Sequence, residues 1–520
     1  MIERALISVY NKDRLEVLAE YFKKHNVEVI ASSGTKNFLS RFGVNCTEVA
    51  DYTGVKEFPE GLVKTLHPKI HFGILMNPNK EEHIKAAQAN GIKPIQLVVV
   101  NLYPFESVAK GNATIEELRK NIDIGGLTML RAAAKNFSNV FVLVDPSQYE
   151  EFVEKVNLAD KNALEEYKKA LACKAFLYSA KYEAIIAKTL HEKLLNTPVF
   201  CEVLANGEIL RYGENWHQKG ILWKTQTFRI LQGKKMSYNN YLDLHYGLLA
   251  LKDFGKYATI VIKHNSPCGI AQTNNALDSF ITAWQCDDLS AFGSVILCNY
   301  AVDGTVAEEI KKRFIEVVVA PKFEEDALNI LKEKKNLRLI ELDANKLKAN
   351  EEYRKTALGV LYQNIDDEIF LEGFKFEFNP KIGIVTSHKP TASNELFTFT
   401  WKCCKHLKSN AIAIGIQQDE KFWMIGSGFG KPNRVDAVKE AIEKALANIK
   451  KYGLKENCIE NCVLASDSFF PFADSIKLIA SHKIKNVIQP GGSIRDKEVI
   501  EEADKNNICM VFTGIRHFKH

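Results

Sequence analysis

The stretch ATIVI at Ala258–Ile262 runs directly into Lys263-His264 and then into NSPCG at Asn265–Gly269. An uninterrupted apolar run of this length predicts a strand covered on both faces of a sheet. Ligands of open α/β sheets bind beyond the carboxyl ends of the strands. A fixed cation and an imidazole that titrates near neutrality therefore predict a proton-transfer site, with a Pro-Cys-Gly turn behind it. A Lys-His pair that only ends a strand is the alternative.

The length and the charge of the chain limit the kind of protein that it can be. A length of 520 residues is too great for one core, so we expect two or three domains. The 69 basic and 64 acidic residues leave a net charge of +5. This small surplus gives no case for nucleic acid, which would require a basic stripe or a motif. It is compatible with anionic substrates such as phosphates.

The eleven cysteines are scattered and contain no CxxC pair. We therefore expect reduced thiols in a cytoplasmic protein and neither a disulfide framework nor a zinc site. The first residues, Met1–Arg4, lack an apolar signal core. Since a membrane helix needs about 18 apolar residues in a row and the chain has no such run, we expect no membrane segment.

Strands and helices alternate over the first 150 residues or so, which predicts a mainly parallel sheet with helical crossovers. Amphipathic stretches at Arg14–Lys24 and Glu81–Ala89 separate the strands, and helical periodicity runs from Gln148 to Lys193. The sequence Asn196-Thr197-Pro198 ends it, so the predicted boundary divides domain 1–195 from domain 196–520. The strands expected in the two domains are Ala5–Val9, Val27–Ala31, Leu97–Val100 and Val140–Val144, then Tyr257–Ile262, Ser294–Cys298, Ile315–Ala320, Ala411–Ile416 and Cys462–Ala465. The segment from Leu337 to Phe378 is charged and is expected to be irregular.

Several loops of the first domain carry polar groups after a strand. Ser32-Ser33-Gly34-Thr35 opens a helix, where backbone N–H groups and hydroxyls can hold a phosphate, or where they only cap the helix. VKTLHPK at Val63–Lys69 supplies cations, a hydroxyl and an imidazole, and NLYPF at Asn101–Phe105 supplies a phenol. DIGG at Asp123–Gly126 precedes a helix that ends in AAAK at Ala132–Lys135. Together they offer anion holders, a phenol and a carboxylate–ammonium pair.

These motifs, in this order, resemble inosine monophosphate (IMP) cyclohydrolase, the N-terminal module of the bifunctional purine-biosynthesis enzymes. VKTLHP combined with NLYPF and IDIGG is a highly specific combination. The second half resembles the partner module, 5-aminoimidazole-4-carboxamide ribonucleotide (AICAR) transformylase. The stretches that match it are Arg211–Asn215, Lys263–Pro267, Ser290–Gly293, Asp467–Asp474 and the tail around Arg516. The resemblance spans essentially the whole chain.

The resemblance implies an α/β fold: a methylglyoxal-synthase-like parallel-sheet domain, then a cytidine-deaminase-like transformylase region of two similar subdomains. It implies that a formyl group passes from 10-formyltetrahydrofolate to AICAR and that formyl-AICAR then closes to IMP with loss of water. It also implies a homodimer, no metal requirement, and no nucleic acid or membrane partner.

The site residues implied by the resemblance fall into three groups. For formyl transfer, His264 takes the proton, Lys263 stabilises the oxyanion and Asn410 holds the amine–carboxamide edge. For ring closure, Lys135 donates and accepts the proton, with Tyr103, Asp123 and Lys64 beside it. The expected binding residues are Lys12, Ser32, Ser33, Gly34, Thr35, Thr65 and Asn101 for the cyclohydrolase nucleotide, Arg211, Tyr212, Gly293, Glu316, Arg434, Phe469 and Arg516 for AICAR, and Asp474, Gly492 and Ser493 for folate, with Phe469 facing the folate as well.

Two positions depart from the family pattern. Leu62 stands where the family has a basic residue before VKTLHP, so the phosphate would depend more on the Ser32–Thr35 loop, Lys12 and Lys64. The glutamine-containing turn of the family reads GSGFGKPNR at Gly426–Arg434, which leaves the approach of Arg434 open.

Two other functions compete with this interpretation. A methylglyoxal-synthase-like domain can act as a ligand sensor, which would need the phosphate pocket but not Tyr103, Asp123 and Lys135, and would not be followed by a formyl-transfer half. A zinc nucleoside deaminase would need H-x-E and P-C-x-x-C. Pro267-Cys268 is followed by Gly269-Ile270-Ala271 with no second cysteine, which disfavours the deaminase. The run Phe469–Phe472 can equally be core, and only Asp467 and Asp474 beside it favour a site.

Overall fold

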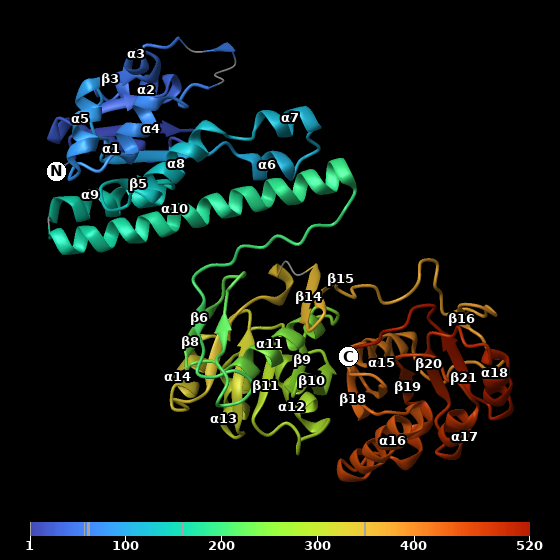
Figure 1. Cartoon of the computed structure of the whole chain (residues 1–520). Coiled ribbons are helices and arrows are strands. Elements are labelled where there is room, and N and C mark those ends of the chain that lie inside the picture. Colours follow the sequence, from blue (N-terminus) through green and yellow to red (C-terminus); the bar gives the residue numbers. More distant parts are fainter. Residues whose placement is uncertain (1, 57, 60–62, 159, 348–349) are drawn as a thin grey trace. The chain divides into compact units, whose positions relative to one another are not determined.

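The computed structural model describes residues 2–56, 58–59, 63–158, 160–347 and 350–520. The chain forms two compact units, Met1–Asn206 and Gly207–His520, each with its own hydrophobic core (Figure 1). We call them unit 1 and unit 2. The predicted boundary at 195/196 and this division fall in the same stretch, after the long helix of unit 1.

Unit 1 is built on a parallel sheet with the strand order β3-β2-β1-β4-β5. Its strands are buried apolar runs, as a parallel sheet covered by helices requires. The four strands predicted here are confirmed to within two residues at each end. The strands are β1 (Arg4–Val9), β2 (Glu28–Ala31), β3 (Cys46–Glu48), β4 (Leu97–Asn101) and β5 (Phe141–Leu143).

A long helix near the end of unit 1, α10, packs against α8, β5 and α6 (Figure 1). The periodicity predicted from Gln148 to Lys193 is divided into two helices, because Asp160 caps the second one by accepting a hydrogen bond from the Asn162 N–H. The helices are α1 (Leu15–His25), α2 (Ser33–Ser40), α3 (Val49–Thr53), α4 (Pro68–Leu75), α5 (Glu81–Ala89), α6 (Phe105–Ala109), α7 (Ile115–Lys120), α8 (Gly125–Lys135), η2 (Pro146–Gln148), α9 (Tyr149–Leu158), α10 (Lys161–Leu190) and the π-helical η3 (His191–Leu195).

Unit 2 contains a twelve-stranded mixed sheet with the order β16-β21-β20-β19-β17-β18-β10-β9-β11-β12-β13-β8. Two small hairpins, β6–β7 and β14–β15, lie outside this sheet. The strands of unit 2 are β6 (Glu208–Ile209), β7 (Ile221–Leu222), β8 (Arg229–Gln232), β9 (Ala258–Lys263), β10 (Ser266–Gln272), β11 (Ser294–Cys298), β12 (Ile315–Ala320), β13 (Arg338–Glu341), β14 (Glu351–Thr356), β15 (Gly359–Asn364), β16 (Gly383–Ile384), β17 (Ile412–Gln418), β18 (Lys421–Gly428), β19 (Val463–Ser466), β20 (Asn486–Gln489) and β21 (Cys509–Phe512).

The two halves of this sheet repeat one topology. In the first half, the hairpin β9–β10 pairs antiparallel with β11, then β11, β12 and β13 run parallel, and β8 closes the edge antiparallel. In the second half, β17–β18, β19, β20, β21 and β16 repeat these directions in the same order. The halves join where β10 pairs with β18 over only two residue pairs, Ala271 with Trp423 and Gln272 with Phe422.

The helices of unit 2 alternate with the strands in both halves, and α11 and α15 hold equivalent places before the hairpins. The helices are α11 (Tyr238–Leu251), α12 (Ala276–Gln285), α13 (Gly304–Lys311), α14 (Glu325–Leu331), η4 (Ala344–Lys346), α15 (Asn394–Lys405), α16 (Arg434–Lys451), η5 (Glu456–Asn461), α17 (Asp474–Ser481) and α18 (Asp496–Lys505). Within the described part of the chain, none of the helices is long and apolar enough to cross a membrane.

Two predictions about unit 2 were wrong. The Pro-Cys-Gly sequence at Pro267–Gly269 is not a turn but the middle of β10, and the chain turns earlier, at His264-Asn265. The segment from Leu337 to Phe378 is not irregular throughout, since it holds β13, η4 and the β14–β15 hairpin. Charged residues suit β14 and β15 because that hairpin stands outside the core, with β15 exposed along its whole length.

Candidate active sites

The candidate phosphate loop of unit 1 lies at the carboxyl ends of β1 and β2. Ser32 caps α2 in an extended conformation, and its hydroxyl donates to Thr35 Oγ1 at 3.1 Å. Thr35 Oγ1 also accepts from the Val9 N–H at 3.2 Å, which ties the loop to β1. The start of α2 thus presents backbone N–H groups and hydroxyls, a pattern that binds anions.

A lysine reaches this loop from a distant part of the sequence. Lys64 Nζ donates to Ser33 Oγ at 3.2 Å, and Ser33 Oγ donates to Glu48 Oε1 at 2.6 Å. Lys36 pairs with the same carboxylate, 3.4 Å from Glu48 Oε2. The hydrogen bond from Ser33, followed by these cations, lowers the pKa of Glu48, so this carboxylate stays ionised.

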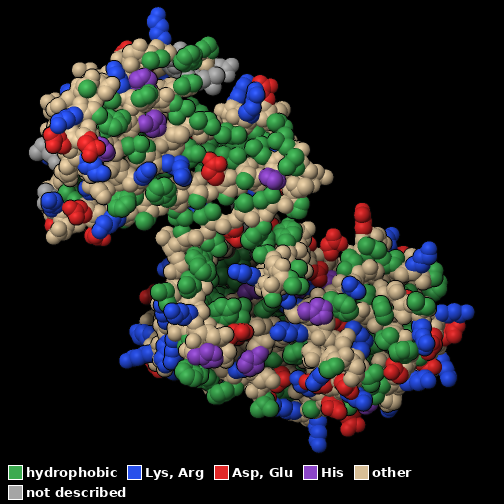
Figure 2. All heavy atoms as spheres, in the orientation of Figure 1, with side chains coloured by type: hydrophobic (Ala, Val, Ile, Leu, Met, Phe, Trp, Pro, Cys, Tyr) green, Lys and Arg blue, Asp and Glu red, His purple; other side chains and the backbone are tan. Residues whose placement is uncertain are grey.

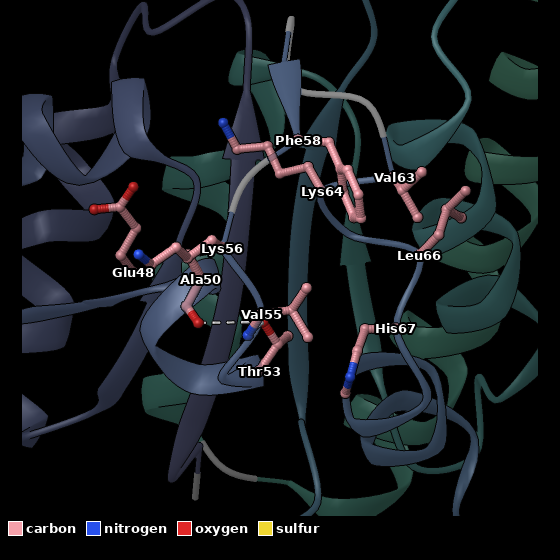
Figure 3. Close-up of a pocket in the computed structure, with 10 residues that line it drawn as sticks. All are labelled: Glu48, Ala50, Thr53, Val55, Lys56, Phe58, Val63, Lys64, Leu66 and His67. Carbon is pink, nitrogen blue, oxygen red and sulfur yellow. Dashed lines mark hydrogen bonds between the residues drawn. The ribbon is translucent and has the colours of Figure 1, made fainter.

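A pocket of about 50 Å³ opens beside Lys64, with Glu48 on one side and His67 on the other (Figure 3). His67 caps α4, because its Nδ1 accepts from the Lys69 N–H at 3.1 Å. The predicted motif VKTLHP therefore contributes both a cation and a helix start to this region. Leu62 lies outside the described residues, so its predicted effect on phosphate binding stays a prediction.

The phenol and the carboxylate predicted for ring closure come together. Tyr103 lies half-exposed after β4, and its ring meets Tyr10 edge-on at 5.9 Å. Burial raises the pKa of Asp123, although its carboxylate accepts hydrogen bonds from the backbone N–H groups of Gly126, at 2.7 Å, and Tyr103. The loop that carries the phenol thus contacts a carboxyl with a raised pKa, which is suited to acid–base work.

The two glycines of the IDIGG motif are required by contacts. A Cβ atom at Gly126 would lie 2.6 Å from Asp123 Oδ2, and one at Gly125 would overlap Thr65 Oγ1. Thr65, predicted as a binding residue, is buried against this helix start. The motif thus lets VKTLHP and the Asp123 loop meet closely at the start of α8.

The other predicted residues Lys135, Asn101 and Lys12 lie at separate places in unit 1. Lys135 is the exposed last residue of α8, about 15 Å along the axis from Gly125, so the helix does not bring it to Asp123. The Asn101 amide holds the Tyr10–Asn11 turn, since its Oδ1 accepts from both N–H groups at 2.7 and 2.8 Å. Lys12 follows this turn, and its Nζ donates to the Tyr10 carbonyl at 3.3 Å.

The Lys263-His264 site of unit 2 is a two-residue hairpin turn. His264 and Asn265 both have positive φ, 52° and 65°, between the paired residues Lys263 and Ser266. This matches the turn type whose twist suits a hairpin. The turn leaves the His264 imidazole exposed, while Lys263 Nζ donates to the carbonyls of Phe292 at 2.7 Å and Gly293 at 3.2 Å.

Helix α11 organises the first half of unit 2, a role that no sequence motif indicated. Asp243 Oδ1 accepts from the Asn265 N–H at 2.7 Å, and Asn240 Nδ2 donates to the predicted binding residue Glu316 at 2.8 Å. Asn239 Nδ2 donates to the Glu214 carbonyl at 3.2 Å, which places the Arg211–Asn215 loop at the same end of α11. Burial raises the pKa of Asp243, which the Asn265 hydrogen bond and the charges of His264 and Lys263 oppose.

The second half gathers Asn410, Arg434 and Asp467. Arg434 Nη2 donates to Asn410 Oδ1 at 2.8 Å, and its Nη1 donates to Ser466 Oγ at 2.8 Å and pairs with the fully buried Asp467. Asn410 Nδ2 donates to the Lys431 carbonyl at 2.9 Å. The altered GSGFGKPNR turn therefore still delivers Arg434 to Asn410. Asp467, which the sequence marked only as a neighbour of Phe469, holds this array together.

The predicted folate residues follow neighbouring parallel strands. Phe469 and Asp474 come after β19, and Gly492 and Ser493 come after β20. The two loops touch, because Arg495 lies over the Phe472 ring at 4.7 Å. Of the aromatic run, Phe470 is core, whereas Phe469 is half-buried and Phe472 exposed. Arg516 is exposed in the tail after β21.

The strand directions put both clusters of unit 2 at one edge of the twelve-stranded sheet. β9 ends at this edge, and β17 begins there, next to the end of β19. β9 and β17 are three strand positions apart, at least about 14 Å at the usual strand spacing. The halves pair only at the opposite edge, so His264 and Asn410 of one chain do not meet.

The fold and these sites define an α/β protein with a candidate anion-binding helix start in unit 1 and candidate acid–base groups in unit 2. Two family models match the chain: the MGS-like domain matches residues 14–128, within unit 1, and the AICARFT/IMPCHase bienzyme matches residues 133–444, which extend from the last third of unit 1 into unit 2. The chain belongs to the AICARFT/IMPCHase bienzyme family.

Relatives match over their whole length. The bifunctional purine biosynthesis protein PurH of Aquifex aeolicus is 40% identical over 99% of this chain and all of its own. The PurH proteins of Thermoanaerobacter sp. and Halalkalibacterium halodurans are each 41% identical, over all of both chains. Among solved structures, the crystal structure of ForH covers 36% of this chain and 98% of its own at 32% identity, with a TM-score of 0.32 that is too low to bear on the fold.

The chain is accordingly a bifunctional AICAR formyltransferase and IMP cyclohydrolase of de novo purine biosynthesis. The sensor and the deaminase are thereby set aside as descriptions of the whole protein. Cys268 agrees with this, since its thiol is buried in β10 and donates to the Val261 carbonyl at 3.5 Å.

Proposed function

We propose that ring closure takes place in unit 1, between the Ser32–Thr35 loop and Asp123. The meeting of Tyr103 and Asp123 beside an anion site carries this proposal. The loop, together with Lys64, holds the phosphate. The carboxamide nitrogen of formyl-AICAR then attacks its own formyl carbon, and positioning contributes most to such an intramolecular step. Asp123, whose pKa burial raises, donates the proton with which the hydroxyl leaves as water.

Lys135 keeps its place in this proposal only through the family resemblance. In unit 1 the acid–base groups that meet are Tyr103 and Asp123, and Lys135 lies at the far end of α8. Asp123→Asn should reduce cyclisation of added formyl-AICAR about 100-fold, as the loss of an acid–base group does. Lys135→Met should reduce it less. A larger loss in Lys135→Met would reverse the two roles.

Formyl transfer is proposed at the His264 turn. The AICAR amine attacks the formyl carbon of 10-formyltetrahydrofolate, His264 takes the amine proton, and the folate nitrogen leaves with a proton as tetrahydrofolate. Lys263 uses two of its three N–H donors on Phe292 and Gly293, so one remains for the developing oxyanion. No step of this proposal requires a metal.

AICAR and folate would be held by residues of both halves. Gly293 accepts a hydrogen bond from Lys263, Glu316 accepts one from α11, and the loop that carries Arg211 and Tyr212 contacts α11 through Glu214. The Asn410–Arg434 pair would hold the amine–carboxamide edge, with Phe469 and Arg516 nearby on the nucleotide. Asp474, Gly492 and Ser493 would bind folate on the touching loops after β19 and β20.

We further propose a homodimer in which the site is shared between two copies. The separation of His264 from Asn410 within one chain supports this, since both are needed on one amine. Mixing inactive His264→Ala and Asn410→Ala proteins tests it. A shared site restores about a quarter of the activity, because half the dimers are mixed and one of their two sites is intact. A site built from one chain restores none.

Two finer points complete the proposal. The matching strand order and directions of the two halves of unit 2 support two similar subdomains of the cytidine-deaminase type. The eleven free cysteines, most of them buried, support a cytoplasmic location. On the face shown in Figure 2, basic and acidic side chains are interspersed over unit 2, which suits small anionic substrates better than nucleic acid.

A further inference from the structure

Two tyrosines of α10 reach the two loops that carry Tyr103 and Asp123. Tyr178 and Tyr182 are four residues apart, so they lie one above the other on the same face of the helix. Tyr178 is half-buried and Tyr182 is 7% exposed. Neither was marked by a sequence motif.

Each phenol holds one loop through a backbone group. Tyr178 Oη accepts from the Leu102 N–H at 3.0 Å, next to Tyr103. Tyr182 Oη accepts from the Asp123 N–H at 2.9 Å and donates to the Asn121 carbonyl at 2.8 Å. The Tyr182 ring also meets Phe105 edge-on at 6.3 Å. One helix face therefore holds both sides of the proposed cyclohydrolase site.

We infer that Tyr178 and Tyr182 are positioning residues for ring closure, which set the distance between the Tyr103 phenol and the Asp123 carboxylate. This inference rests on the site proposed above. The loops are otherwise joined by the hydrogen bond from the Tyr103 backbone to Asp123, so a shift of either loop changes the geometry of both reacting groups. Burial raises the pKa of both phenols, which keeps them neutral and able to donate as well as accept.

The contacts predict which kinetic constant changes. The phosphate loop is held by the hydrogen bonds from Val9 of β1 to Thr35 and from Lys64 to Ser33. The two tyrosines contact other segments. Loss of a phenol should therefore lower kcat of cyclisation and leave KM nearly unchanged. Because misplacement of reacting groups by about 1 Å can cost 100-fold, we expect a roughly tenfold loss for each Tyr→Phe change and more for the double variant.

The same helix supplies a matched control. Tyr167 is 6% exposed on α10, and its hydroxyl has no hydrogen-bond partner among the residues that the structure describes. Tyr167→Phe removes a buried phenol hydroxyl without touching either loop. It should leave cyclisation unchanged.

The experiment uses the full-length protein with Tyr178→Phe, Tyr182→Phe, both together, Tyr167→Phe and Asp123→Asn. Cyclisation is measured with added formyl-AICAR, thermal unfolding checks that unit 1 stays folded, and formyl transfer checks that unit 2 is unaffected. The inference is supported when kcat falls at least fivefold in both loop variants at constant KM while Tyr167→Phe and formyl transfer are unaffected. It is overturned when kcat stays within twofold, or when Tyr167→Phe loses as much. If cyclisation is unaffected in Asp123→Asn, the proposed location of the site itself is wrong.

Discussion

At the scale of single residues, backbone conformation explains why His264 is presented so openly. His264 and Asn265 both adopt left-handed φ values, which turn the chain back within two residues of β9. Left-handed residues other than Gly, Asn and Asp are uncommon and gather at functional sites. The sequence could show that a Lys-His pair ends a strand. It could not show the turn, because the following Ser-Pro-Cys-Gly has the composition of a loop and yet forms a strand.

A substitution at this turn must respect its backbone. His264→Asn removes the imidazole but keeps a residue that tolerates positive φ. Formyl transfer should fall by roughly 100-fold to 10,000-fold, the contribution of a general base, while cyclisation of formyl-AICAR stays near normal. Asn265→Gly, which also suits the turn, serves as the control and should retain transfer. Loss of both activities in a folded His264→Asn protein would contradict the two-site assignment.

At the scale of elements, many strands that are apolar runs were predicted correctly from the sequence, whereas several polar or short strands were not predicted. β20 was missed because Asn486 and Gln489 are buried within it and pair with side chains and loops instead of packing as core. The run Ile508–Phe512 is apolar and forms β21, although it was not among the predicted strands. Contacts between distant elements, such as Asp467 with Arg434, leave no trace in local spacing, so the array around Asn410 required the structure.

The long helix α10 gives an element-scale prediction. Unit 1 alone, residues 1–206, should fold and cyclise formyl-AICAR without folate, since it has its own core. A fragment that ends at Leu158 lacks α10 and so uncovers core residues such as Leu130 and Phe141. That fragment should be unfolded or inactive. Circular dichroism and the cyclisation assay on the two fragments decide it, and an active short fragment would show α10 to be dispensable.

At the scale of the whole molecule, a buried ion group joins the two halves of unit 2. Asp253 follows α11, and its carboxylate accepts from His406 Nε2 at 2.6 Å and lies 3.0 Å from Lys405 Nζ, both at the end of α15. Lys405 and His406 are 5% and 4% exposed. Because α11 and α15 are equivalent helices of the two halves, this group fastens the repeat together.

Removing one partner of this buried ion group should therefore destabilise unit 2. Asp253→Ala leaves Lys405 buried without its counter-ion and should destabilise unit 2 by about 3–5 kcal/mol. The double change Asp253→Leu with Lys405→Met removes both charges and should recover most of that loss. Urea unfolding followed by tryptophan fluorescence measures both variants, because all five tryptophans, including Trp401 on α15, lie in unit 2. Equal losses in the single and double variants would rule out the ion pair as the cause.

The same group predicts a pH dependence. Burial lowers the pKa of His406 to about 4, below the value of about 6.5 in an unfolded chain. The unfolded state thus binds the proton first, and stability falls as pH drops from about 6.5 to about 4. His71 and His245, whose pKa values burial also lowers, act in the same direction. His406→Gln should reduce the drop in Tm between pH 7.5 and 5, and an unchanged drop would assign it to the other histidines.

Joining the halves through β10 and β18 has a consequence for how this protein stays dispersed at high concentration. Each half alone would leave a border strand, β10 with seven residues or β18 with eight, whose unpaired backbone groups are templates for uncontrolled aggregation. The seam pairs the two strands at Ala271–Gln272 and Phe422–Trp423, so neither is an outer strand of the joined sheet. The open borders that remain are β16, only two residues long, and β8, which begins with the exposed Arg229. Short and charged borders recruit further strands poorly, so the joined sheet offers little edge on which it could grow.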